Sequence, residues 1–243
     1  MSFLLLPLLV LITRSIGHTS FSEWQKAALE PLKVSLASSL MAMAILVIGG
    51  TPLAWWISQR QSAFARLVEY LLTIPLLMPP LVVGLLLVFL YGPYSFLGVW
   101  MARVGLSASN SFLALVLAEL YEASPYYLFA AVSAFDRVDR NLIYTSYSLG
   151  LPSVATFRRV TFPLAAPGLA VAFSMAWSRA IGAFGAVIII AYYPRGLPVA
   201  IWIALQEQGL PSALPLALTL ILIALPLPLL SLLWRKNSVV HPH

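Results

Sequence analysis

The sequence predicts an all-α membrane protein with about six transmembrane helices. Hydrophobic residues make up 61% of its 243 residues and charged residues only 9%, whereas a soluble domain is about 45–50% apolar and about 25% charged. The mean hydropathy is +0.93, and the apolar residues fall into long runs separated by short polar segments. Such a chain cannot bury its apolar surface in one water-facing core, so the bilayer must act as its solvent.

Five apolar stretches reach the roughly 20 residues that a spanning helix needs. They are residues 32–57, 67–91, 112–135, 167–192 and 213–234. A sixth stretch, residues 3–13, is too short to cross about 30 Å at about 1.5 Å per residue. We expect it to be a first span that is short or truncated, and the alternative is a segment that only dips into the interface. Between the stretches 3–13 and 32–57, we expect residues 22–30 to form either an interfacial helix or a plain loop. We expect residues 1–243 to form a single transmembrane domain.

The basic residues predict which side each loop occupies, because short cytoplasmic loops carry an excess of lysine and arginine. With both termini in the cytoplasm, the inner side holds Arg60, Arg66, Arg137, Arg140, Arg158, Arg159, Arg235 and Lys236. The outer side holds Arg14, Lys26, Lys33, Arg103 and Arg195. This distribution predicts a multi-pass protein of the cell membrane with cytoplasmic termini.

Composition also excludes several classes of function. There are no cysteines and three histidines, His18, His241 and His243, none of them inside a predicted span, so neither a zinc site nor an intramembrane serine protease is expected. No glycine-rich phosphate loop is present. The net charge of +6 is scattered among loops without a basic stripe, which argues against nucleic-acid binding. We expect no catalytic residues, no metal and no cofactor.

The proline-rich stretch Thr-Ile-Pro-Leu-Leu-Met-Pro-Pro interrupts the predicted span 67–91 with Pro75, Pro79 and Pro80. Each proline removes a backbone hydrogen bond and bends the helix. Because broken helices line cavities rather than face lipid, these residues favour a protein with a transport pathway over a simple anchor.

Two acidic residues, Glu119 and Glu122, lie about halfway along the predicted span 112–135. Carboxylates at membrane depth indicate a functional site, such as a proton or cation site. They stand three residues apart and therefore on adjoining faces of one helix. The alternative is that they pair with Arg179 or with polar neighbours inside the bundle.

The residue Arg179 lies about twelve residues into the predicted span 167–192. An arginine at this depth costs several kcal/mol unless it is paired or faces water. Ser174 and Ser178 add hydroxyl groups, and Gly182 and Gly185 allow close backbone approach. A guanidinium with hydroxyls suits a tetrahedral oxyanion, whereas the structural alternative is an ion pair with one of the two glutamates.

The segment 136–166 is the largest predicted inner loop, and it reads as a helix, a break, a short helix and a second break at Pro163. Gly150 stands where the first helix needs a left-handed cap, and Pro152 suits the first turn of the next helix. Within it, residues 150–163 form a short basic segment between apolar runs, as expected of a segment that a partner protein binds. The alternative is a plain solvated loop.

Within this segment, Val154 and Phe157 stand three residues apart and are expected to anchor the short helix in a partner's groove. Arg158 and Arg159 are expected to meet an acidic rim or lipid phosphates.

Residues 150–163 resemble the EAA loop of ABC importer permeases, whose pattern is Glu-Ala-Ala, three residues, Gly, nine residues and Ile-x-Leu-Pro. Gly150 and Pro163 match this pattern, and Val160 and Phe162 are apolar replacements. Residues 144–146, Tyr-Thr-Ser, stand in place of Glu-Ala-Ala. In that family the loop forms the coupling helix, which seats in a groove on the ATP-hydrolysing subunit.

A second resemblance narrows the substrate. Residues 177–187, Trp-Ser-Arg-Ala-Ile-Gly-Ala-Phe-Gly-Ala-Val, are similar to the Arg-Ala-Leu-Gly-Glu-Phe-Gly-Ala signature of oxyanion permeases for molybdate, tungstate and sulfate. The family's glutamate falls on Ala183 here. Together the resemblances cover about residues 32–230 and imply the type I ABC importer permease fold.

The resemblance implies that two copies form a channel in the lipid bilayer, each bound to an ATP-binding cassette ATPase subunit, and that an extracytoplasmic solute-binding protein delivers the anion. The implied coupling residues are Gly150, Val154, Phe157, Arg158, Arg159 and Pro163. The implied anion pathway comprises Ser174, Ser178, Arg179, Gly182 and Gly185. The expected substrate is molybdate or tungstate. The alternatives are a sulfate/thiosulfate permease of the same type and a proton-coupled secondary carrier using Glu119 and Glu122.

Overall fold

The computed structural model describes residues 2–16, 21–60 and 63–231, and in these ranges every regular element is helical. The all-α prediction is therefore confirmed. The elements are α1 (Ser2–Ile16), α2 (Phe21–Gln59), α3 (Ala63–Leu77), α4 (Pro80–Tyr91), α5 (Phe96–Arg103), α6 (Phe112–Asp136), α7 (Arg140–Ser148), α8 (Ser153–Thr156), the π-helical turn η1 (Phe157–Thr161), α9 (Phe162–Ile181), α10 (Val187–Ile190), α11 (Leu197–Gln208) and α12 (Leu210–Ala224).

Three helical runs in the described residues are long and apolar enough to cross a membrane: Trp24–Gln59, Ser153–Ile181 and Leu210–Ser231. A fourth arises if Tyr70–Leu77 and Pro80–Tyr91 count as one broken span. The break falls at the Met78-Pro79 step, as the proline pattern predicts, because proline cannot donate the next helical hydrogen bond. The chain thus has several candidate spans, and the count of about six remains a prediction.

The helix α6 also has the length of a span. Its 25 residues extend over about 37 Å at about 1.5 Å per residue, but it carries Glu119 and Glu122 near its middle. The 15-residue α1 is short, as expected for the first apolar segment, and has Pro7 inside it.

Two predicted boundaries were wrong. Residues 22–30 do not form a separate interfacial helix, because α2 runs without interruption through this region. Packing explains this: Ala28 is buried against α11 and α12, and Trp24 Nε1 donates to Thr219 Oγ1 at 2.8 Å. The predicted span 167–192 is not one helix either, since α9 ends at Ile181 and a non-helical stretch precedes α10.

The described chain forms two compact units, each made of three separate stretches. The first unit comprises Met1–Ala42, Pro79–Glu119 and Ala180–Pro226. The second unit comprises Met43–Met78, Leu120–Arg179 and Leu227–His243.

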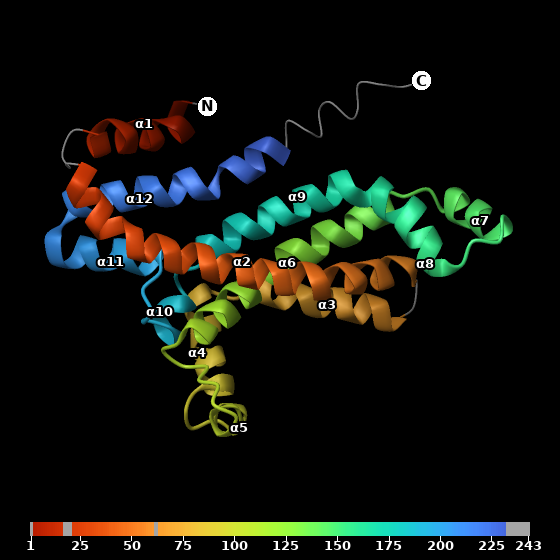
Figure 1. The fold of residues 1–243 in the computed structure, drawn as a ribbon, viewed down its shortest axis with the longest axis horizontal. Coiled ribbons are helices and arrows are strands. Elements are labelled where there is room, and N and C mark those ends of the chain that lie inside the picture. The colour runs from red at the N-terminus through yellow and green to blue at the C-terminus, as the bar shows by residue number, and fades with distance from the viewer. Residues whose placement is uncertain (1, 17–20, 61–62, 232–243) are drawn as a thin grey trace. The chain divides into compact units, whose positions relative to one another are not determined.

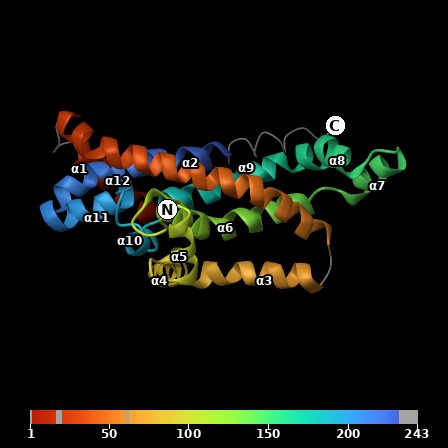
Figure 2. The ribbon, with the colours of Figure 1, turned by 60° about the horizontal axis from the view of Figure 1, so that its bottom comes forward.

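In the first unit, α11 and α12 run side by side, as Figures 1 and 2 both show. The helix α4 packs against α10, and close approach requires glycine there. A Cβ added at Gly84 would lie 2.8 Å from Ile189 Cβ and 2.9 Å from the carbonyl oxygen of Ala186. A Cβ at Gly185 would lie 2.5 Å from Pro80 Cβ.

In the second unit, the C-terminal half of α2 packs against α6. A Cβ added at Gly50 would meet the ring of Tyr127 at 3.1 Å, and the Tyr127 hydroxyl shares a 2.6 Å hydrogen bond with Thr51 Oγ1. The helix α9 approaches α6 where Gly168 faces Ala134. These contacts between small residues are typical of helices that pack within a membrane.

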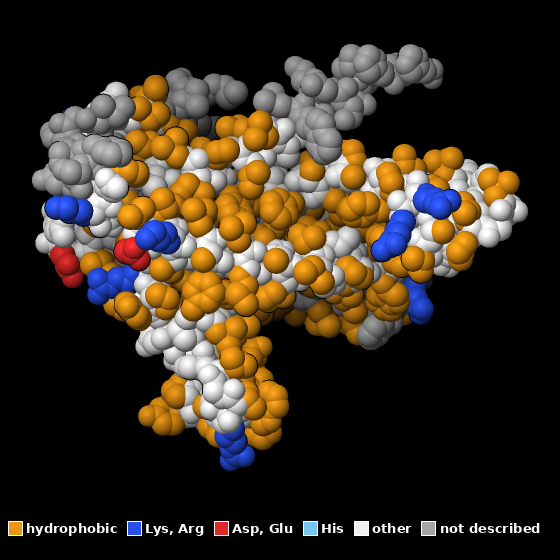
Figure 3. All heavy atoms as spheres, viewed as in Figure 1, with side chains coloured by type: hydrophobic (Ala, Val, Ile, Leu, Met, Phe, Trp, Pro, Cys, Tyr) orange, Lys and Arg blue, Asp and Glu red, His pale blue; other side chains and the backbone are white. Residues whose placement is uncertain are grey.

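The surface is strongly apolar, as Figure 3 shows over much of the visible face, including the α4–α5 region. In that region Phe89, Tyr94 and Phe96 are almost fully exposed. Soluble monomers rarely display apolar patches on this scale, so the surface agrees with a lipid-facing protein.

Candidate functional site

The helix α7 ends in the capped turn that the sequence predicts at Gly150. Gly150 has φ +80°, its N–H donates to the carbonyl of Tyr147 at 2.9 Å, and the N–H of Leu151 donates to the carbonyl of Ser146 at 3.1 Å. This pair of hydrogen bonds is the Schellman motif. The opposite end of α7 is capped by Asp139, whose side chain accepts from the N–H of Asn141.

The short helix α8 begins directly after Pro152 and is tied back to α7. The N–H of Thr156 donates to the carbonyl of Pro152 at 3.0 Å, and the buried Ser146 and Thr156 hydroxyls lie 3.1 Å apart. Figure 1 shows α7 and α8 as neighbouring elements in this unit. The predicted sequence of helix, break and short helix is confirmed.

The ring of Phe157 lies against this chain's own aromatic side chains. Its centroid is 4.7 Å from that of Trp55, 6.2 Å from that of Phe135 and 5.8 Å from that of Phe162. Aromatic pairs at these separations stabilise packing by about 0.5–1.5 kcal/mol each. The ring thus attaches the segment to α2 and α6, and contact of the half-buried Phe157 with a partner's groove stays a prediction.

The other predicted coupling residues of this segment are exposed. Val154 is 68% exposed, and Arg158, Arg159 and Pro163 are also exposed. The predicted break at Pro163 is wrong, since the helical run Ser153–Ile181 passes through it. The π-helical turn η1 immediately before it changes the hydrogen-bonding pattern where proline cannot donate, and such turns are frequent at functional sites.

We expect Gly150→Val to weaken the turn between α7 and α8, because a β-branched residue at positive φ costs roughly 1–2 kcal/mol. A side chain would find open space there, with nothing within 4 Å of an added Cβ, so the backbone alone opposes the change. The measurement is the amount of ATPase subunit that co-purifies with each variant. Gly150→Asn is the matched control, because asparagine tolerates this conformation, and equal losses for both variants would contradict the argument.

The residue Arg179 lies in the last turn of α9 rather than in the middle of a span. Its Nη2 is 2.7 Å from Glu122 Oε2, and its Cζ is 5.8 Å from the centre of the Tyr126 ring. Glu122 and Tyr126 are four residues apart and therefore share one face of α6. The ion pair that the sequence left as the alternative for Arg179 is confirmed, with Glu122 as its partner.

The two predicted serines of the anion pathway differ in their surroundings. Ser174 is buried, and its hydroxyl donates to the carbonyl of Val171 and shares a 2.9 Å hydrogen bond with Ser231. The Ser174 hydroxyl is thus engaged within α9 and with Ser231, and its part in an anion pathway stays a prediction. Ser178 is half-buried beside Arg179 in sequence.

The glycines Gly182 and Gly185 lie in the break between α9 and α10 and belong to the first unit. Gly185 allows the close backbone approach that the sequence predicts, since Pro80 lies directly against it. In the same unit, the buried Glu119 accepts a hydrogen bond from Ser38 Oγ at 2.8 Å. The two glutamates, three residues apart in α6, therefore have different partners.

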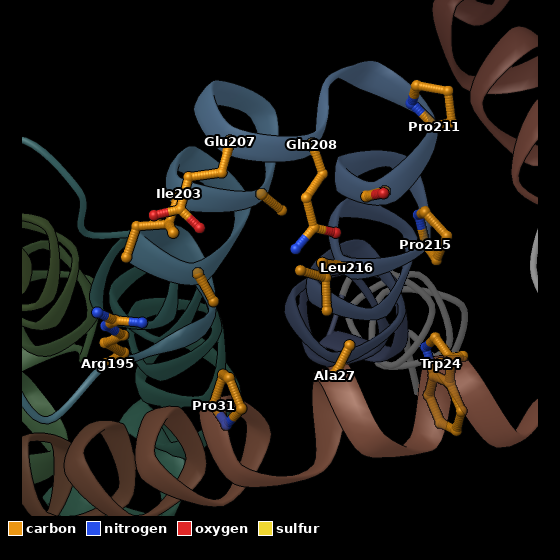
Figure 4. A pocket seen from close by; sticks show the side chains of 13 residues that line it. Trp24, Ala27, Pro31, Arg195, Ile203, Glu207, Gln208, Pro211, Pro215 and Leu216 are labelled. Carbon is orange, nitrogen blue, oxygen red and sulfur yellow. The ribbon is translucent and has the colours of Figure 1, made fainter.

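A cavity of about 550 Å³ opens in the first unit between the start of α2, α11 and α12. Figure 4 shows Gln208 and Leu216 directed into this space, with Arg195 and Glu207 on one wall. Trp24, Ala27 and Pro31 of α2 line its floor. This cavity was not predictable from the sequence, because its lining comes from helices about 180 residues apart in the chain.

Comparison with known proteins identifies the family to which this chain belongs. Residues 48–239 match the family model described as "Binding-protein-dependent transport system inner membrane component". A probable molybdenum ABC transporter permease protein of Haloferax volcanii is 40% identical over 190 residues, which cover 78% of this chain and 69% of the relative.

Two further relatives are more distant. A molybdate/tungstate transport system permease protein of Pyrococcus furiosus is 28% identical over 81% of this chain and 74% of its own length. A probable sulfate transport system permease protein of Nephroselmis olivacea is 27% identical over 97% of this chain and 85% of its own length.

Among solved structures, a bacterial alginate ABC transporter in complex with a pentasaccharide-bound periplasmic protein matches with a TM-score of 0.71. That match covers 98% of this chain and 88% of the other at 16% identity, and supports the type I importer permease fold. ATP hydrolysis in such systems belongs to a separate ATPase subunit. This chain is therefore a multi-pass inner-membrane permease of the binding-protein-dependent ABC transporter family.

Proposed function

We propose that this chain forms the membrane pathway of an ATP-driven importer for a tetrahedral oxyanion, with molybdate or tungstate as its substrate. The observation that carries the proposal is the 40% identity to the Haloferax molybdenum permease over 78% of this chain. The sulfate permease from Nephroselmis is 27% identical, so sulfate or thiosulfate is the second candidate.

The segment from Gly150 to Pro163 is proposed to be the coupling segment, which receives the motion of the ATPase. Its cap and its aromatic contacts fix it to α2, α6 and α7, while Val154, Arg158 and Arg159 remain exposed for a partner. A segment attached rigidly on one face and exposed on the other transmits a push to the helices that hold it. We place this segment and both termini in the cytoplasm, following the distribution of basic residues.

Two copies of the chain, each with one ATPase subunit, would enclose the pathway, and a solute-binding protein would deliver the anion outside the cell. The proposed anion site is Arg179. Its planar guanidinium presents several N–H donors that match an oxyanion, and its side chain is 33% exposed despite the ion pair.

The decisive experiment reconstitutes the chain with an ATPase subunit and a binding protein from the same organism in vesicles, and measures uptake of radiolabelled molybdate, tungstate and sulfate. We expect uptake that requires ATP, with molybdate and tungstate preferred over sulfate. Preference for sulfate would select the second candidate. Uptake by the chain alone, driven by a pH gradient, would instead identify a secondary carrier and overturn the proposal.

A further inference from the structure

The guanidinium of Arg179 is held by two groups of a single helix. The carboxylate of Glu122 lies 2.7 Å from one terminal nitrogen, and the ring of Tyr126 lies on the same face of α6. Glu122 is almost completely buried, with 2% of its side chain exposed. Only the arginine side of this pair is open to another ligand.

The guanidinium retains capacity for such a ligand. Arginine has five N–H donors, and the ion pair with Glu122 engages Nη2 while a third of the arginine side chain remains exposed. Arg179 lies in the last turn of the helical run Ser153–Ile181, where an arginine side chain can reach polar surroundings. A polar ligand can therefore approach the exposed part of this side chain.

A guanidinium without a counter-ion would bind an oxyanion too tightly for transport. A pathway residue must bind strongly enough to admit the ion and weakly enough to release it. A dianion next to an uncompensated arginine in a low-dielectric setting would be held tightly. A carboxylate already in contact with the arginine lowers that affinity, because it repels the incoming anion and competes for the same donors.

We propose that Glu122 is a built-in counter-ion that keeps the affinity of Arg179 for the transported oxyanion low. This inference rests on the proposed function and adds a specific role for Glu122. As the anion arrives, Arg179 shares its donors between the anion and Glu122, and the restored 2.7 Å pair releases the anion. Glu122 is thus a positioning residue that acts through Arg179.

The test uses Glu122→Gln, which removes the charge while keeping the size of the side chain. Binding of radiolabelled molybdate is measured on the purified permease–ATPase complex without binding protein, followed by ATP-dependent uptake with binding protein present. We expect binding about tenfold tighter, which corresponds to about 1.4 kcal/mol, and slower uptake. The gain should disappear in the double variant Glu122→Gln with Arg179→Gln.

A merely structural ion pair gives a different result. Glu122→Gln would then lower the stability of the complex without tightening anion binding, and that outcome overturns the inference. If Glu122→Gln does not fold, Glu122→Asp keeps the charge but lengthens the pair, and we expect binding about threefold tighter, or about 0.65 kcal/mol. Unchanged binding in a folded Glu122→Asp complex also overturns it.

These outcomes are separable from a failure of the proposed function. If the wild-type complex takes up no oxyanion with ATP, the proposed function itself is wrong and the inference falls with it. If wild-type uptake is normal and Glu122→Gln binds molybdate no more tightly, only the counter-ion role is refuted.

Discussion

Replacing Gly84 with valine is expected to disrupt the packing of α4 on α10 and to lower the apparent melting temperature by about 6–12 °C. A Cβ at this position would already lie 2.8 Å from Ile189 Cβ and 2.9 Å from the backbone oxygen of Ala186. A backbone atom cannot rotate away as a flexible side chain can, so α4 must move. Overpacking of this kind costs about 3 kcal/mol, and about 2–4 °C accompanies each kcal/mol in a chain of this size.

The matched control is Gly49→Val in α2. It makes the same substitution at a helical glycine of an apolar segment, but nothing lies within 4 Å of an added Cβ. We expect a change of less than about 1 kcal/mol there. The measurement is the apparent melting temperature of both variants in detergent, recorded as the loss of the monodisperse peak on heating. Equal shifts would show that contact with α10 is not what requires glycine at position 84.

The second large effect is expected from Phe157→Ala, which removes the ring that attaches the coupling segment to Trp55 and Phe135. Complete burial of phenylalanine would make this substitution cost about 3–5 kcal/mol; since Phe157 is half-buried, we expect about 2–3 kcal/mol. We further expect ATP-dependent uptake to fall at least about tenfold, while the ATPase subunit still hydrolyses ATP. Uptake falls because a coupling segment that is detached from α2 and α6 does not transmit its motion to these helices.

A comparison with Val154→Asp distinguishes attachment of the coupling segment to α2 and α6 from its association with the ATPase subunit. Val154 is 68% exposed, so the permease should keep its thermal stability, whereas association with the ATPase should fall because a charge enters the contact surface. Co-purification and coupled uptake distinguish the two variants. If Phe157→Ala weakens ATPase association without lowering permease stability, Phe157 faces the partner after all.

Local features of the chain were predictable because each depends on a few neighbouring residues. The hydropathy of the long runs predicts helices in a bilayer, and the Pro79-Pro80 pair predicts the break between α3 and α4. The cap at Gly150 was also predictable, since the left-handed conformation of that turn favours glycine wherever the helix lies.

Features that depend on packing were predicted less well. The predicted span 167–192 was too long, because apolar residues continue beyond Ile181 although the helix does not. The contacts of Phe157 with Trp55 and Phe135 were not predictable, because helical spacing beside Val154 does not reveal which side chains lie behind the segment. The short helices α5 and α11 escaped notice, since neither reaches the length of a span.

Composition and spacing alone were enough to predict a helical membrane protein with a capped basic segment and an arginine that needs a counter-charge. They offered Glu119 and Glu122 as equal candidates, because residues three apart lie on adjoining faces of a helix. The fold distinguishes them, because it pairs Glu122 with Arg179 and Glu119 with Ser38. The physical reason is that the choice depends on which face of α6 packs against α9, and that contact joins residues 57 positions apart in the chain.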